Sequence, residues 1–174
     1  MPDFTTARLH LRRLAVGDAP GLHEAYGDAE VMRFWEDPPS RNLAATERRI
    51  LSAQADDPAR QAAWAVLTPA DGRCIGMVNY HSRQPSARKL SVGWILAPQY
   101  WGHGYMTEAM HALLLHCFET LDTHRIEVEI AAENLRSLRL ADRLGFRREA
   151  LLADSLFPPG PHRPVWLYAA VRPR

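Results

Sequence analysis

One stretch decides the fold of this chain: Gly93-Trp94-Ile95-Leu96-Ala97-Pro98-Gln99-Tyr100-Trp101-Gly102-His103-Gly104-Tyr105-Met106-Thr107-Glu108-Ala109. Its first half is an apolar run that predicts a buried strand, and Pro98 ends the strand because proline has no N–H to give to a sheet. Gly102 and Gly104 then flank His103 in a tight turn. Behind the turn, apolar residues recur at helical spacing and predict one long helix with a continuous apolar face. These residues are Met106, Ala109, Met110, Leu113, Leu114, Cys117, Phe118 and Leu121.

A strand, a glycine turn and a helix start in succession favour an anion site. The first N–H groups of a helix have no partner within the helix, and the helix dipole adds positive potential there. Glycine lets a phosphate approach the backbone closely. The pattern therefore predicts a phosphate-binding turn, the other interpretation being an ordinary strand-to-helix connection.

Two common classes of phosphate-binding loop do not fit this turn. The sequence is not GxxxxGK[ST] and no lysine follows the turn, which argues against a nucleotide P-loop. It is not GxGxxG either, and no βαβ unit with a downstream ribose-binding acid is apparent.

The segment instead resembles the acyl-CoA pyrophosphate loop of the GNAT N-acetyltransferase superfamily. Residues 101–109 look most like the branch of ribosomal-protein N-terminal (alanine/serine) acetyltransferases. The general pattern is [QR]-x-x-G-x-[GA]; aligned on Gly104, this chain has Trp101 at the first position and Met106 at the last. The resemblance implies that backbone N–H groups of the loop bind the CoA pyrophosphate. The implied loop residues are Trp101, Gly102, His103, Gly104, Tyr105, Met106 and Thr107.

The rest of the chain predicts an α+β domain. Apolar and polar residues alternate over residues 6–14 and 125–131, and further strands are expected over 63–68, 73–81, 88–97, 146–152 and 165–171. Helices are expected after Asp18, around residues 30–35, from Ser40 or Thr46 to just before Pro58, and from Asn134 to a stop at Gly145. This order is the layout of a GNAT domain. We expect residues 1–174 to form a single such domain, with a mixed, mostly antiparallel seven-stranded sheet flanked by helices.

The resemblance also implies roles for residues outside the glycine turn. In the superfamily, the strand before the turn splays from the strand after the long helix, and the pantetheine arm pairs with its backbone, here around Ile95 and Leu96. The segment Asn134-Leu135-Arg136-Ser137, followed by Leu144-Gly145-Phe146, resembles the family's Asn-x-x-Ser…Leu-Gly-Phe segment. By this resemblance Asn134 binds the CoA arm and Ser137 assists the departing thiolate. The alternative for Asn134 is a helix N-cap alone.

The sequence leaves the general base open. Relatives often carry a glutamate before the final hairpin, and Asp154 is the carboxylate nearest to that position. An acidic residue common on the strand before the loop is Ser91 here, and an aspartate common at the start of the last strand is Pro164. The other candidates are Glu36, Asp37, Glu129, His162 and a water molecule.

Composition excludes several classes of function. A formal net charge of +1 over 174 residues gives no nucleic-acid footprint. No segment is apolar and long enough to predict a membrane span, and Met-Pro-Asp-Phe does not resemble the start of a signal peptide, so we expect a cytoplasmic protein with no membrane partner. Cys74 and Cys117 lack metal-like spacing, and no metal cofactor is expected.

These patterns and the resemblance together predict an enzyme that transfers an acetyl group from acetyl-CoA to a primary amine by direct attack in a ternary complex. The weak signature of a base favours an acceptor such as a protein or peptide N-terminal α-amine, because an amine of pKa about 8 is already partly neutral at pH 7. A small-molecule amine (polyamine or antibiotic-like) is the alternative. A non-catalytic acyl-CoA-binding module and a nucleotide-binding protein are the alternatives from other classes. The oligomeric state is open, and a homodimer is possible.

Overall fold

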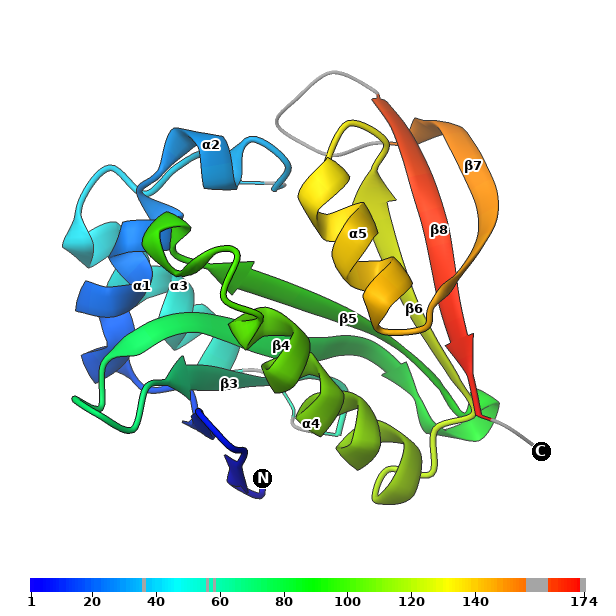
Figure 1. The fold of residues 1–174 in the computed structure, drawn as a ribbon, viewed down its shortest axis with the longest axis horizontal. Helices are drawn as coiled ribbons and strands as arrows, with labels where there is room; N and C mark the ends of the chain where they lie inside the picture. Colours follow the sequence, from blue (N-terminus) through cyan, green and yellow to red (C-terminus); the bar gives the residue numbers. More distant parts are fainter. Residues whose placement is uncertain (36, 56, 58, 156–162, 173–174) are drawn as a thin grey trace.

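The computed structural model describes the whole chain except residues 36, 56, 58, 156–162 and 173–174 and the side chains of residues 55, 154 and 155. The described strands form one curved sheet that crosses the molecule (Figure 1). These strands are β1 (Phe4–Thr5), β2 (His10–Arg13), β3 (Ala62–Leu67), β4 (Cys74–Gln84), β5 (Lys89–Leu96), β6 (Arg125–Ala131), β7 (Arg147–Ser155) and β8 (Arg163–Val171).

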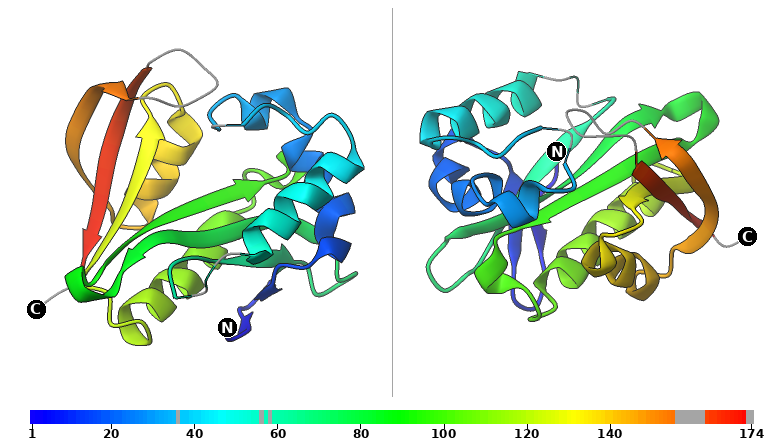
Figure 2. Two further views of the ribbon diagram at one scale, coloured as in Figure 1. Left: turned by 180° about the vertical axis from the view of Figure 1, so that it is seen from behind. Right: turned by 90° about the horizontal axis from the view of Figure 1, so that it is seen from above.

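Helices cover both faces of this sheet. They are α1 (Ala19–Tyr26), α2 (Ala29–Met32), α3 (Leu43–Ala55), α4 (Tyr105–Glu119) and α5 (Leu135–Arg143). Figure 2 shows from above that α1 to α3 lie on one side of the sheet and α4 and α5 on the other. Each side has its own buried apolar cluster, the first centred on residues such as Met77, Ile95 and Ile50 and the second on Trp64, Met110 and Leu113.

The order of strands in the sheet creates a seam. The order is β1-β2-β3-β4-β5-β6-β8-β7, and every neighbouring pair is antiparallel except β5 and β6. The parallel strands β5 and β6 pair only over Lys89–Ser91 and Arg125–Glu127. Beyond Ser91 the two strands diverge, which matches the splay that the family resemblance implied (Figure 1).

The mixed, mostly antiparallel sheet is confirmed, but it has eight strands where the sequence predicts seven. The strand predicted over residues 6–14 is wrong at its start, because Thr6 closes a turn. Its N–H donates to the Leu9 carbonyl (2.9 Å), and its Oγ1 accepts the Leu9 N–H (3.0 Å). Residues 4–5 therefore fold back on β2 as the additional strand β1.

Two predicted helix caps are also wrong. The Asp18 side chain does not cap α1, because both of its carboxylate oxygens accept hydrogen bonds from Arg12 (2.7 and 2.8 Å). Helix α3 begins at Leu43, and the side chain that caps it is Asn42, in place of the predicted Ser40 or Thr46.

The predicted ends of α5 are confirmed. Asn134 Oδ1 accepts the Ser137 N–H (3.2 Å) as an N-cap does, and Gly145 follows the helix with the left-handed φ of 81° that favours glycine.

Candidate functional site

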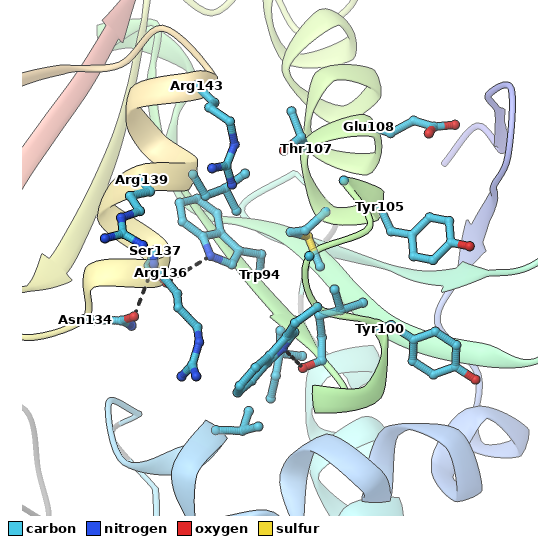
Figure 3. A pocket seen from close by; sticks show the side chains of 18 of the residues that line it. Trp94, Tyr100, Tyr105, Thr107, Glu108, Asn134, Arg136, Ser137, Arg139 and Arg143 are labelled. Atoms are coloured by element: carbon cyan, nitrogen blue, oxygen red, sulfur yellow. Dashed lines mark hydrogen bonds between the residues drawn. The ribbon is translucent and has the colours of Figure 1, made fainter.

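A cavity of about 900 Å³ opens where β5 and β6 diverge (Figure 3). Its lining comes from α2, the end of β5, the glycine turn, α4 and α5, and from Arg8 near the N-terminus. Most residues of the quoted stretch that the sequence singles out lie in this lining, although His103 does not. The seam in the sheet thus coincides with the pocket.

The glycine turn has the backbone that an anion site requires. Gly102 and Gly104 adopt φ values of 79° and 78°, in the left-handed region that other residues rarely enter. Helix α4 starts directly afterwards, and its first intrahelical donor is the Glu108 N–H, which bonds to the Gly104 carbonyl (3.1 Å). The N–H groups of Tyr105, Met106 and Thr107 precede that donor, so they have no partner within the helix. Three backbone donors at a helix start suit a phosphate group.

Trp101 fastens the turn to the end of β5. Its indole N–H donates to the Leu96 carbonyl (2.9 Å), and the Arg136 guanidinium lies over its ring, 4.2 Å from the centroid. A large aromatic residue at this position, where the superfamily pattern has Gln or Arg, therefore has a structural role in the loop.

The backbone of β5 presents polar groups to the seam. The Ala97 N–H donates to the Ile75 carbonyl of β4 (3.0 Å). Because the N–H and C=O groups of successive strand residues point alternately to the two sides, those of Ile95 also face β4, and those of Trp94 and Leu96 face the seam. The backbone groups that face the gap between β5 and β6 are those of Trp94 and Leu96. Contact of the pantetheine arm with this strand remains a prediction.

Ser137 and Trp94 meet across the seam. The Trp94 indole N–H donates to Ser137 Oγ at 3.3 Å, so that a strand and a helix from opposite sides of the cavity are joined (Figure 3). Asn134 lines the cavity as well as capping α5. The two roles that the sequence left open for Asn134 are therefore compatible in space.

Arginines dominate the charges around the cavity. Arg8, Arg136, Arg139 and Arg143 line it, together with the carboxylates Glu30 and Glu108. Both carboxylates are paired, Glu108 with Arg8 (2.7 Å) and Glu30 with Arg136 (2.6 Å). Within the described part of the chain, Arg139 and Arg143 have no carboxylate partner, so the lining has a positive excess that suits a polyanion.

Sequence reasoning missed Arg8 and Glu30 as lining residues. Glu30 lies on α2, and Arg8 lies on the turn between β1 and β2. Each is about 100 residues away from its partner along the chain. Local periodicity contains no signal for such a pairing.

The described residues place none of the proposed bases beside Ser137. Glu36 and His162 lie outside the described residues, and so does the side chain of Asp154, whose backbone belongs to β7. Asp37 is 68% exposed and bonded to Arg49 (2.8 Å). Glu129 is exposed on β6 and is not among the described cavity lining. Asp154 therefore stays a prediction.

Two absences hold for the described residues. No group of three or more His, Cys, Asp or Glu side chains there is arranged to hold a metal ion. No helix in the same part of the chain combines the length and apolar character needed to cross a membrane.

Comparison with known proteins gives a family and a set of similar structures. Residues 8–147 match the family model described as acetyltransferase (GNAT) domain. The chain is 24% identical to the uncharacterized N-acetyltransferase YoaA of Bacillus subtilis, over 99% of this chain and 98% of that protein. It is similar in fold to the spermidine N-acetyltransferase of Vibrio cholerae solved with CoA and spermine (TM-score 0.81, 23% identity, 95% and 96% covered). It is also similar to RimL, a ribosomal L7/L12 α-N-protein acetyltransferase solved with coenzyme A (TM-score 0.85, 18% identity, 98% of both chains).

Proposed function

The chain belongs to the GNAT acetyltransferase family and is an acetyl-CoA-dependent N-acetyltransferase, and we propose that its acceptor is the N-terminal α-amine of a protein or peptide. The amine attacks the thioester directly while both substrates are bound. The observation that carries this proposal is the cavity at the seam, where Ser137 and Trp94 face each other beside the glycine turn.

The contact between Trp94 and Ser137 supports a role in the departure of the thiolate. As the amine nitrogen bonds to the acetyl carbonyl carbon, the carbon–sulfur bond breaks and negative charge forms on sulfur. Since Ser137 Oγ accepts its hydrogen bond from Trp94, its own hydrogen is available to donate to that sulfur. A thiol of pKa about 8.5 is already a fair leaving group, so modest assistance is sufficient.

The charges of the cavity support an α-amine acceptor. An α-amine of pKa about 8 is neutral in roughly one molecule in ten at pH 7, whereas a lysine amine is neutral in about one in 2,500. An α-amine therefore needs little help from a base, and the described lining offers no unpaired carboxylate to provide it. Val31 on α2, and Phe34 and Trp35 directly after it in the sequence, form an apolar part of the lining. This apolar surface suits the first side chains of a peptide.

A small-molecule amine is the second candidate, and Glu30 is the observation that favours it. Its carboxylate lines the cavity and would attract a polyamine if it left Arg136. One structurally similar enzyme was solved with CoA and spermine, although likeness at that level of identity supports only the fold.

The test is a comparison of acceptors. Purified protein and acetyl-CoA are mixed with one of three acceptors, and CoA release is followed. The acceptors are short peptides with a free N-terminus, the same peptides with a blocked N-terminus and an internal lysine, and spermidine. Mass spectrometry locates the acetyl group. We expect turnover on the free N-terminus alone. Turnover on spermidine without turnover on any peptide would overturn the peptide proposal in favour of the second candidate.

A further inference from the structure

The turn between β1 and β2 contacts the start of α4, although the two lie far apart in the sequence. Glu108, in the first turn of α4, accepts hydrogen bonds from Thr6 Oγ1 (2.6 Å), the Arg8 N–H (2.8 Å) and Arg8 Nε (2.7 Å). Arg8 Nη2 lies 2.7 Å from the same carboxylate. Of these residues, only Glu108 belongs to the stretch 93–109 that contains the glycine turn.

Glu108 raises an electrostatic question. A carboxylate in the first turn of α4 stands close to the backbone donors where we place the phosphates, and two anions there would repel each other. The side chain is only 18% exposed. Burial raises the pKa of Glu108, but the hydrogen bonds from Thr6 and Arg8 lower it by more, so the group is ionised. Its charge must be compensated for an anion to bind next to it, and Arg8 compensates it.

Arg8 also contacts the glycine turn itself. Its Nη1 donates to the His103 carbonyl (2.9 Å), and its guanidinium lies over the Tyr105 ring, 4.8 Å from the centroid. A Cβ atom on Gly104 would stand 3.4 Å from Arg8 Nη2. The guanidinium is therefore held beside the glycine whose backbone the phosphate approaches. Figure 3 shows Tyr105 and Glu108 on the side of α4 that faces away from α5.

The Arg8 guanidinium has N–H groups left to donate to a ligand. Of its five N–H groups, the contacts with Glu108 and His103 occupy three. The side chain is 49% exposed and lines the cavity. Arginine holds a planar fork of donors that fits phosphate oxygens, and here Glu108 fixes the direction of that fork.

We propose that Arg8 binds the pyrophosphate of acetyl-CoA directly, with Glu108 as the positioning residue that holds its guanidinium at the glycine turn. The inference rests on the proposed use of this turn for acetyl-CoA, and it adds a cationic side chain from outside the loop to the backbone donors of the loop.

The test separates direct binding from mere compensation of Glu108. Calorimetry measures CoA affinity for wild type, Glu108→Gln, and Arg8→Ala/Glu108→Gln. In the Glu108→Gln background no carboxylate needs compensation, so adding Arg8→Ala removes the proposed contact with phosphate, together with the contacts that Arg8 makes with the His103 carbonyl and the Tyr105 ring. We expect about a tenfold loss from this second substitution, since a hydrogen bond to a charged group at a half-exposed site has that order of effect. Equal CoA affinity of the single and double variants would overturn the proposal.

Ligand controls identify the phosphate concerned. The loss should be the same for CoA and for dephospho-CoA, which lacks the 3′-phosphate but keeps the pyrophosphate, and it should vanish for pantetheine, which has no phosphate. A loss for CoA alone, or an equal loss for pantetheine, would contradict the assignment to pyrophosphate. Arg48→Ala, which removes an exposed arginine from α3, is the matched control and should bind CoA as wild type does. If wild type itself binds no CoA, the proposed function fails and not this inference alone. Melting curves confirm that each variant is folded.

Discussion

At the scale of single residues, Ser137 is oriented before any substrate is present. The Trp94 indole N–H donates to its Oγ, and the Ser137 N–H is held by Asn134 Oδ1. A hydroxyl group that is fixed in this way loses little entropy when it donates to a leaving group. In the proposed mechanism, the direction of its free hydrogen decides whether it can donate to the departing sulfur.

Ser137→Ala should lower kcat about tenfold to a hundredfold and leave acetyl-CoA affinity nearly unchanged. The reason is that the hydroxyl assists only as charge develops on sulfur, and an interaction made only in the transition state affects the chemical step. Steady-state kinetics with a melting curve is the measurement. Full activity in the folded variant would exclude Ser137 from the mechanism. Trp94→Phe, which removes the N–H donor together with part of the ring, should show a smaller loss of kcat.

Gly104→Val should weaken CoA binding in a folded protein. Gly104 has a φ of 78°, which a β-branched residue resists, and a Cβ there would stand 3.4 Å from Arg8 Nη2, in the space that we assign to phosphate. Calorimetry measures the effect. Gly17→Val is the control, because a Cβ at Gly17 meets no atom within 4 Å. Unchanged CoA affinity of Gly104→Val would mean that the phosphates bind elsewhere.

Residues that act through the backbone were predictable from the sequence, and those that act through distant side chains were not. Gly102, Gly104 and Asn134 have local signatures, because positive φ and helix capping select particular residue types. The pairing of Arg8 with Glu108 spans 100 residues and has no such signature.

At the scale of elements, the loop between β2 and α1 is fixed by an ion pair whose carboxylate is buried. Asp18 is 4% exposed, accepts two hydrogen bonds from Arg12 and a third from the Ala15 N–H (2.8 Å). The hydrogen bond that Arg12 donates to Asp18 raises the pKa of Arg12. The carboxylate thus ties the end of β2 to the start of the helical segment that covers one face of the sheet.

Asp18→Ala should destabilise the protein by about 2–3 kcal/mol, because it leaves a guanidinium and a backbone N–H without their acceptor. The value is below that for a fully buried pair, since Arg12 is partly exposed. Urea denaturation followed by circular dichroism measures the change. Asp142→Ala, at an exposed position on α5, should change stability by less than about 0.5 kcal/mol. Equal effects of the two substitutions would refute a structural role for the pair.

Most strands and helices were predictable, and their errors have a common cause. Alternation and helical periodicity report which face of an element is buried, so they located β3 to β8, α4 and α5 within a few residues. These patterns do not report which of several polar side chains forms the hydrogen bond with the backbone at a turn or at a helix start. The roles of Thr6, Asp18 and Asn42 were therefore misjudged, and with them β1 and the start of α3, whereas α1 does begin directly after Asp18 as predicted.

At the scale of the whole molecule, the sheet consists of two halves that share only a short pairing. Strands β1 to β5 form one half and β6, β8 and β7 the other, with three residue pairs between them. The short α2 segment reaches across the mouth of the seam through the ion pairs Glu30–Arg136 and Arg33–Glu133. The family resemblance predicted the seam, whereas this bridge depends on surface charges from two segments about 100 residues apart and was not predictable.

Acidification should destabilise the folded chain in two stages. Burial lowers the pKa of His81 and of His116, and the N-terminal ammonium and Arg83 lower that of His116 further. A histidine in the unfolded chain binds a proton near about pH 6.5, where these two remain neutral in the folded chain. The unfolded state therefore binds more protons as the pH falls below that value, and the free energy of unfolding declines until the lowered folded pKa values are passed.

Carboxylates produce the second stage. Hydrogen bonds from Thr6 and Arg8 to Glu108, and from Lys89 and Arg125 to Glu127, outweigh the effect of burial and lower the pKa of both groups. Their stabilising contribution is complete above the unfolded value of about 4.3 and is lost as the pH falls through the folded pKa values.

Urea denaturation at half-unit steps from pH 8 to about pH 3 measures both stages. In the double variant His81→Gln/His116→Gln the decline that begins near about pH 6.5 should disappear, while the decline below about pH 4.3 should remain, because the variant removes the two imidazoles and leaves Glu108 and Glu127 in place. His111→Gln, at an exposed position on α4, is the matched control and should keep both stages. If the double variant and the control lose stability in parallel as the pH falls below about 6.5, protonation of His81 and His116 is not what destabilises this fold in mild acid.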